Sequence, residues 1–294
     1  MHDINFTHEH ELKKHDFLGC CKDCQACLDI IKPHIMGFAT RIKKYTRKML
    51  KALKPEDLYR LYQLLDDLAH MEAGVHLAGL LLDEPDIRRE LPEIRSYYSG
   101  FFSIHEKHLA EDLLKSKDPW ETLKSFPFYP RYEALVKNQI RAVRPAPGSR
   151  LAFVGCGPVP MTLILMSRLY GIPSVGLDNS GETVDLSKKV TQCLGLEKQI
   201  EIIHGDDSGL RGLDWDLVLV AALAEPKARI FQTLRKILKE RKAHVPVIFR
   251  TYTGMRAVLY EPVQPEDIQG FSIVKEILPT GRVNNTTVFA ELDE

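Results

Sequence analysis

The sequence has no surplus of charge of either sign and no long hydrophobic run. Lys+Arg and Asp+Glu number 40 each, whereas proteins that bind nucleic acid or membrane surfaces depend on surplus basic charge. No segment reaches the about 18 apolar residues that a transmembrane helix requires, and we find no secretory leader pattern. We therefore expect a cytoplasmic protein whose partners are small molecules, without nucleic acid or membrane.

Cysteine is also scarce, with six in 294 residues. Four of them, Cys20, Cys21, Cys24 and Cys27, fall within one short segment, while the other two stand alone. A disulfide-stapled secreted fold would need a more even distribution in a smaller chain. The distribution therefore argues against disulfides and leaves the cluster to be explained separately.

Two interpretations of the cysteine cluster stay open. With the upstream histidines, the four thiols offer soft ligands for Zn, Ni or an iron–sulfur cluster. Alternatively they are reduced thiols, because residues 20, 24 and 27 share one face of a helix. The spacing of these three is also that of the radical S-adenosylmethionine loop. That loop follows the first strand of a (β/α) barrel, however, and here only a polar leader precedes it.

The chain changes its hydrophobic period near residue 145. Residues 28–140 repeat apolar side chains at three- and four-residue spacing, which predicts a bundle of four or five helices. The segment VRPAPGSR (143–150) interrupts this pattern with two prolines and a glycine. We expect a Cys/His-rich leader at 1–30, a helical domain at 31–145 and an α/β domain at 146–294.

Short apolar runs alternate with helical patterns after residue 146. Strands are expected at RLAFVG, SVGLD, QIEIIHG, DWDLVLVAA and HVPVIFRTY. Strand–helix alternation predicts a parallel, doubly wound sheet. The last segment, from FSIVKEI to TTVFAEL, has two strand patterns without a helix between them, which predicts an antiparallel hairpin at the sheet edge. The predicted fold class is α/β: a Rossmann-like domain that binds S-adenosylmethionine, with an N-terminal helical bundle as a lid.

The ligand prediction rests on a glycine-rich turn and two later acids. Gly155 and Gly157 follow the first strand and precede a helix, so backbone N–H groups face a ligand there. Asp178 ends the second strand, where a carboxylate binds ribose hydroxyls, and Asp206 follows the third strand, where an acid meets an adenine amino group. Pro158 stands where a dinucleotide turn would continue toward a third glycine. We therefore favour S-adenosylmethionine over NAD.

Three stretches together resemble one family. They are residues 118–138 (DPWETLKSFPFYPRYEALVKN), 151–166 (LAFVGCGPVPMTLILM) and 221–262, which runs from AALAEPKARIF to FRTYTGMRAVLYEP. The aromatic FPFYPRY combined with GxGPxPxT is far more specific than a general nucleotide motif. From about residue 55 to the C-terminus the chain is similar to the nicotianamine synthases, especially their archaeal members. The first 50 residues lie outside this resemblance.

The resemblance implies an alkyl transfer that is not a methyl transfer. In that family a substrate amine attacks Cγ of S-adenosylmethionine, the aminocarboxypropyl group moves, and methylthioadenosine leaves. Repeated transfer builds a chain of amines and carboxylates that chelates Ni, Fe, Zn or Cu. The resemblance also implies that the helical half covers the cleft and encloses the growing product.

A catalytic pair is implied by the same resemblance. The substrate α-amine is protonated at about pH 7, so a base must remove a proton before attack. Glu106 matches the family's catalytic glutamate in its distance from the WETL stretch, and Tyr132, the last residue of FPFYPRY, matches the tyrosine that works with it. Apolar surroundings would raise the pKa of the glutamate, which suits a base. Taken alone, Glu106 resembles an ordinary exposed helix acid.

Five further residues are candidates for binding the two substrates: Thr162, Tyr129, Glu225, Arg250 and Arg256. The hydroxyl of Thr162 is suited to the methionine carboxylate, and a guanidinium binds carboxylates bidentately. Glu225 is a candidate for holding the acceptor amine, and Tyr129 for stacking on adenine. Each also has a structural explanation: helix capping, ordinary ion pairs or packing.

Two other functions share the same nucleoside site. One is an S-adenosylmethionine-dependent methyltransferase, and the other is a metal-responsive protein that binds S-adenosylmethionine without turnover. The acceptor is also open, because glutamate, another amino acid or a second S-adenosylmethionine would each supply an amine. The apolar segment YYSGFF (97–102) leaves room for a homodimer contact.

Overall fold

The computed structural model describes residues 24–71, 73–242 and 245–293, which divide into two compact units. One unit contains the described residues up to Phe102 together with Tyr252–Pro262, and the other contains Ser103–Thr251 and the residues from Val263 onward. Within the described residues, no helix is long and apolar enough to cross a membrane. The predicted domain bounds at residues 30 and 145 stay a prediction.

The first unit is helical. Its elements are α2 Cys24–Ile42, α3 Arg47–Ala52, α4 Pro55–Ala69, α5 Val75–Asp83, the first part of α6 Pro85–Lys115, and the short η3 Gly254–Val258. Counting α7 and α8 of the second unit, seven helices lie in the described residues before 145, so the predicted number of four or five was too low. Helices α3 and α7 have six and seven residues, which is too short for a periodic pattern to show.

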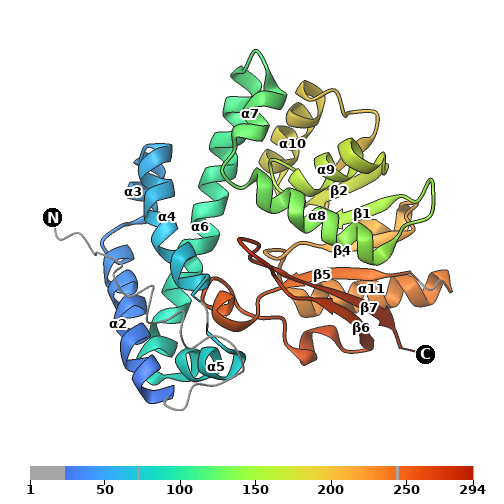
Figure 1. Ribbon diagram of the computed structural model, residues 1–294. Coiled ribbons are helices and arrows are strands. Elements are labelled where there is room, and N and C mark those ends of the chain that lie inside the picture. Colours follow the sequence, from blue (N-terminus) through green and yellow to red (C-terminus); the bar gives the residue numbers. More distant parts are fainter. Residues whose placement is uncertain (1–23, 72, 243–244, 294) are drawn as a thin grey trace. The chain divides into compact units, whose positions relative to one another are not determined.

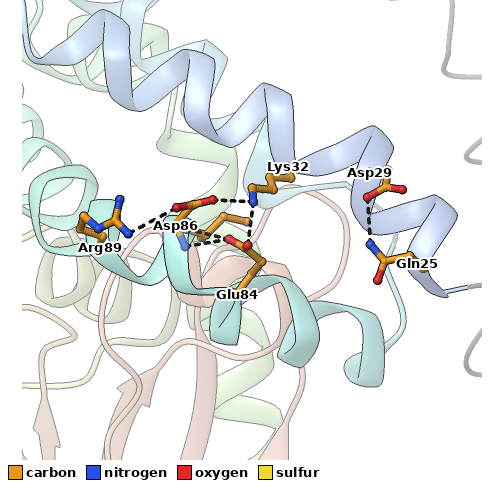
Figure 2. A network of polar contacts seen from close by, with 7 residues as sticks. Gln25, Asp29, Lys32, Glu84, Asp86 and Arg89 are labelled. Atoms are coloured by element: carbon orange, nitrogen blue, oxygen red, sulfur yellow. Dashed lines mark hydrogen bonds and ion pairs between the residues drawn. The ribbon is translucent and has the colours of Figure 1, made fainter.

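A polar network joins the start of α6 to α2 in the first unit (Figure 2). The ammonium of Lys32 lies 2.6 Å from Glu84 Oε1 and 2.7 Å from Asp86 Oδ2. The other oxygen of Glu84 accepts the backbone N–H groups of Asp86 and Ile87 at 2.8 and 3.1 Å. Glu84 therefore both caps α6 and binds the lysine of α2, so one side chain fixes the entry of α6.

Aromatic side chains form much of the core of this unit. The ring of Tyr62 stacks on that of Phe101 with centroids 4.1 Å apart. The hydroxyls of Tyr98 and Tyr252 lie 3.1 Å apart, and their rings pack edge to face. The contact between Tyr98 and Tyr252 joins the segment Tyr252–Pro262 to α6, although the two residues are 154 positions apart in the sequence.

A seven-stranded sheet forms the second unit, in the order β3-β2-β1-β4-β5-β7-β6. The strands are β1 Leu151–Val154, β2 Ser174–Asp178, β3 Ile200–His204, β4 Leu217–Val220, β5 Val247–Thr251, β6 Phe271–Ile277 and β7 Thr286–Leu292. The first five pair in parallel, and the last two form an antiparallel hairpin. The predicted Rossmann-like fold is confirmed.

Helices cover both faces of this sheet (Figure 1). They are α8 Tyr129–Val143, α9 Met161–Tyr170, α10 Gly181–Cys193 and α11 Lys227–Arg241. The same unit also contains the last part of α6, α7 Pro119–Ser125 and the short η2 Asp207–Gly212 and η4 Pro265–Ile268. Side chains such as Val154 and Phe249 pack with α11 in one apolar cluster. The neighbouring Arg250 points to the other face, where it contacts α8 and α9. Successive side chains of β5 point to opposite faces of the sheet, so α11 lies on one face and α8 and α9 lie on the other.

Candidate active site

The glycine-rich turn between β1 and α9 is the centre of the candidate site. Gly155 and Gly157 have φ of 79° and 74°, a conformation that side chains other than glycine rarely adopt. A Cβ on Gly157 would lie 3.2 Å from Oε2 of Glu106. Pro158 continues the turn and is partly buried. The turn therefore places the backbone of Gly157, which has no side chain, next to the carboxylate of Glu106 in α6.

Asp178 lies at the end of β2, as predicted, and fixes this turn. Its Oδ2 accepts the N–H of Gly157 at 3.0 Å, and its Oδ1 accepts the N–H of Ser180 at 3.1 Å. A carboxylate oxygen has two acceptor sites, so each keeps one for a further donor. The geometry is compatible with the predicted contact to ribose hydroxyls.

Asp206, after β3, is held more tightly than the sequence indicated. Its Oδ1 accepts the N–H of Ser208 at 3.0 Å and the hydroxyl at 2.6 Å, and its Oδ2 lies 2.9 Å from Nη1 of Arg229. The Ser208 hydrogen bonds, and then the charge of Arg229, lower the pKa of Asp206. This carboxylate is therefore an anion held at the start of η2.

Glu106 and Tyr132 are brought together by α6 and α8. The Tyr132 hydroxyl donates to Glu106 Oε1 at 3.2 Å. Burial raises the pKa of Glu106 from its ordinary 4.5 to about 7, the hydrogen bond from Tyr132 opposes this shift, and the charge of Asp178 adds to it. A carboxylate with a pKa near neutrality exchanges a proton readily at neutral pH.

An aromatic group lies next to Glu106. The imidazole of His105 is buried, and its ring centroid lies 5.2 Å from that of Phe126 and 5.6 Å from that of Phe128. Burial, and then the nearby His108, lower the pKa of His105 to about 4, so the ring is neutral at pH 7. These side chains pack the segment before α8 on α6 and thereby help to place Tyr132 opposite Glu106.

Thr162 and Arg250, predicted separately, meet in one buried network. Nη2 of Arg250 donates to Oγ1 of Thr162 at 2.9 Å and to Oε1 of Gln139 at 3.2 Å. Gln139 Nε2 in turn donates to Oγ1 of Thr287 at 3.3 Å. All four residues are buried. The network connects α9, β5, α8 and β7, and the predicted ligand contacts of Thr162 and Arg250 stay predictions.

The other predicted binding residues are Arg256, Glu225 and Tyr129. Arg256 belongs to η3 in the first unit, and its predicted contact with a substrate stays a prediction. Glu225 follows β4, and its carboxylate contacts the ammonium of Lys227 at 3.1 Å. Tyr129 is the first residue of α8 and is partly buried, and burial raises the pKa of its hydroxyl.

The predicted metal cluster lies largely outside the described residues. Cys20 and Cys21 precede them, and for Cys24 only the backbone is described, as the start of α2. Cys27 is buried in α2. Within the described part of the chain, no group of three or more His, Cys, Asp or Glu side chains is placed to hold a metal ion. Metal binding at the cluster stays a prediction.

Two buried polar residues of the second unit were missed from the sequence. Gln139 falls on the apolar stripe of α8 beside Leu135 and Val136, where a polar residue signals a buried contact. Lys227 begins α11, although a cation in the first turn is disfavoured by the helix dipole. In each case a residue that contradicts the local pattern marked a tertiary contact.

Comparison with protein families decides the relationship. The family model described as nicotianamine synthase protein matches residues 29–294. The chain belongs to the nicotianamine synthase family. Nicotianamine synthase 1 of Arabidopsis thaliana is 26% identical over 258 residues, which cover 82% of this chain and 79% of the relative. The resemblance predicted from the sequence is confirmed, and the match begins earlier than the expected residue 55.

Solved structures of one protein, MtNAS, are similar over nearly the whole fold. A complex of a glutamate-to-glutamine mutant of MtNAS with S-adenosylmethionine has 35% sequence identity and a TM-score of 0.81, covering 90% of this chain and 98% of that one. A complex of MtNAS with MTA and tNA has 34% identity and the same TM-score and coverage. The family and the fold are thus both shared with a protein crystallised with S-adenosylmethionine.

Proposed function

We propose that this chain is a nicotianamine synthase-like transferase that moves aminocarboxypropyl groups from S-adenosylmethionine to an amine. The observation that carries the proposal is the Glu106 carboxylate, which accepts the Tyr132 hydroxyl, lies against Gly157 and has a pKa of about 7. A proton acceptor beside a nucleoside-binding turn is what amine alkylation requires, whereas a pure sensor of S-adenosylmethionine needs no base.

The residues of the turn fit the nucleoside substrate. Gly155 and Gly157 leave the backbone bare at positive φ, and Asp178 keeps one acceptor site on each oxygen for the ribose hydroxyls. The known ligand of MtNAS supports the same assignment for this chain. S-adenosylmethionine is a substrate here, because it is consumed in each transfer.

The proposed reaction runs through Glu106. The ionised carboxylate takes a proton from the substrate ammonium, and the freed nitrogen lone pair attacks Cγ of S-adenosylmethionine. The Cγ–S bond breaks, its electron pair stays on sulfur, and the positively charged sulfonium leaves as neutral methylthioadenosine. Tyr132 holds the carboxylate in position and, by donating to it, stabilises its ionised form.

The product follows from the chemistry of the transferred group. Each transfer adds one carboxylate and one new amine, so repeated transfer yields an opine-like chain with N and O ligands for a metal ion. We infer that the acceptor is an amino acid such as glutamate, or a second S-adenosylmethionine. In this proposal Thr162, Arg250, Arg256, Glu225 and Tyr129 bind the substrates, and Asp206 lies near the adenine.

Product analysis by mass spectrometry tests the proposal. The protein is incubated with S-adenosylmethionine, with and without glutamate, and the nucleoside product is identified. We expect methylthioadenosine together with products heavier by whole aminocarboxypropyl units. S-adenosylhomocysteine would show a methyltransferase instead, and bound but unreacted S-adenosylmethionine would show a binding protein.

Three further expectations stay predictions. They are a cytoplasmic location, a homodimer, and a Zn, Ni or iron–sulfur site at the N-terminal cysteines. Tyr97, Tyr98 and Phe101 are buried in the first unit, so the segment 97–102 does not form the exposed apolar patch expected for a dimer contact. Native mass spectrometry tests the last two together, since it reports subunit number and bound metal in one spectrum.

A further inference from the structure

Lys227 is a buried cation in a position that the reaction itself does not explain. It is the first residue of α11, and its side chain is 3% exposed. The ammonium donates to the carbonyl oxygen of Ala222 at 2.9 Å, to that of Ala224, and to Oε1 of Glu225 at 3.1 Å. All these acceptors belong to the loop that connects β4 to α11.

That loop packs on the first glycine of the glycine-rich turn. A Cβ on Gly155 would lie 2.8 Å from Cβ of Ala224 and 3.4 Å from Cβ of Ala221. The N–H of Ala221 donates to the carbonyl of Val154 at 3.0 Å, which extends the pairing of β4 with β1 up to the turn. The glycine-rich turn therefore packs directly against this loop.

The surroundings of Lys227 are unfavourable for a cation except for its contacts with the loop. Burial lowers its pKa, and the carboxylate of Glu225 opposes that shift. The lysine also lies at the end of α11 where the helix dipole disfavours a cation. A buried ammonium is tolerated only when its donors are satisfied. Here loop oxygens supply that compensation, so the loop and the lysine fix each other.

We propose that Lys227 is a positioning residue, which holds residues 221–225 against Gly155 and so sets the space where the methionine part of S-adenosylmethionine lies. The identity of this ligand rests on the proposed function, whereas the packing of the loop on the turn does not. Lys227 itself touches neither substrate. Without the ammonium, the carbonyls of Ala222 and Ala224 lose their donor and the loop leaves Gly155.

The test compares Lys227→Met with Lys236→Met, the same substitution at an exposed position of α11. Dissociation constants for S-adenosylmethionine are measured by equilibrium dialysis, and kcat and KM from methylthioadenosine release. We expect binding of S-adenosylmethionine to be weakened by about 10- to 100-fold in Lys227→Met, which corresponds to about 1.4–2.7 kcal/mol. We expect kcat to change much less, and Lys236→Met to match the wild type in every measurement.

A purely structural role predicts a different result, namely a lower melting temperature with an unchanged dissociation constant and KM. That result would overturn the proposal. Because Lys227→Met can fail to fold, Ala224→Val supplies an independent variant that keeps the lysine and pushes the loop from Gly155. It should also weaken binding of S-adenosylmethionine, and normal binding in a folded Ala224→Val protein would contradict the proposed coupling.

The two proposals fail in distinguishable ways. If wild-type protein binds S-adenosylmethionine but releases no methylthioadenosine, the proposed reaction is wrong, and the dialysis comparison of the Lys227 and Lys236 variants still decides the positioning role. If methylthioadenosine is released normally and Lys227→Met binds as tightly as Lys236→Met, only the positioning role is wrong.

Discussion

Helix α6 carries carboxylates in two regions with opposite surroundings. Near its start, Asp86 and the capping Glu84 share the ammonium of Lys32, and their hydrogen bonds to it lower the pKa of both. Further along, Glu106 is bonded to a neutral phenol, and burial raises its pKa to about 7. A cationic partner keeps a carboxylate ionised, whereas a neutral partner combined with burial leaves it free to exchange a proton at neutral pH.

The largest expected effect comes from removing the exchangeable proton site. In Glu106→Gln the amide cannot accept the ammonium proton, so methylthioadenosine release should fall by about 10²–10⁴-fold. Binding of S-adenosylmethionine, measured by equilibrium dialysis, should persist because the turn and Asp178 are unchanged. Asp86→Asn on the same helix is the matched control and should retain full turnover. Equal turnover in Glu106→Gln and wild type would reject the role of Glu106.

The pH dependence of turnover sharpens the comparison. In the proposed reaction the ionised form of Glu106 is the active one, so turnover should rise with pH through about 7. Tyr132 donates to that carboxylate and lowers its pKa, so Tyr132→Phe should move the midpoint to higher pH and reduce turnover at neutral pH by about tenfold or more. Rate profiles of methylthioadenosine release for both proteins check this. A midpoint that stays in place, or moves to lower pH, would contradict the proposed hydrogen bond.

Stability should respond to pH in opposite ways at the two regions. The pKa of Glu106 is raised on folding, so its contribution to stability is complete below its ordinary value of 4.5 and is lost as pH rises through about 7. Glu106→Gln should therefore be more stable than wild type at alkaline pH, by at most about 3 kcal/mol, and the gain should vanish in acid. Urea denaturation across this range measures the difference. A gain that is independent of pH would not come from titration of Glu106.

The smallest effect is expected at the paired region. Lys32→Met removes the cation that binds Glu84 and Asp86, and should lower the melting temperature modestly because the network is partly solvent-exposed. The pKa values of both acids are lowered on folding, so their contribution is present above their ordinary values and is lost as pH falls. The difference from wild type should thus shrink in acid, with turnover unchanged at neutral pH. A difference that grows in acid would contradict the network.

Much of the sheet could be predicted because its signals are local. The second strand was expected at SVGLD and is found at Ser174–Asp178, and the helix after the first strand ends at Gly171 as expected. Apolar runs bounded by glycine and polar residues set these limits without help from distant parts of the chain. The antiparallel hairpin was also expected, but the insertion of β7 between β5 and β6 depends on long-range pairing.

The residues of the candidate site were harder to identify than the strands from local sequence patterns. Glu106 lies in a helix among polar residues, and only the family resemblance distinguished it from a surface acid. Its contact with Gly157 joins segments that are far apart in the sequence. Arg250 was predicted to bind a ligand, and its guanidinium also contacts Gln139 and Thr162, which local sequence patterns could not indicate because these residues come from distant segments. Lys227 went unnoticed for the same reason, since burial is decided by tertiary packing.

The most direct test of the contrast along α6 is the carboxyl titration of Glu106 itself. The difference between wild type and Glu106→Gln in carboxylate absorption, followed by infrared spectroscopy from acid to alkaline pH, isolates that single group. The structure predicts a titration with a midpoint at about 7. A midpoint near the ordinary value of 4.5 would show that Glu106 is an ordinary anion, and would contradict its assignment as a base matched to neutral pH.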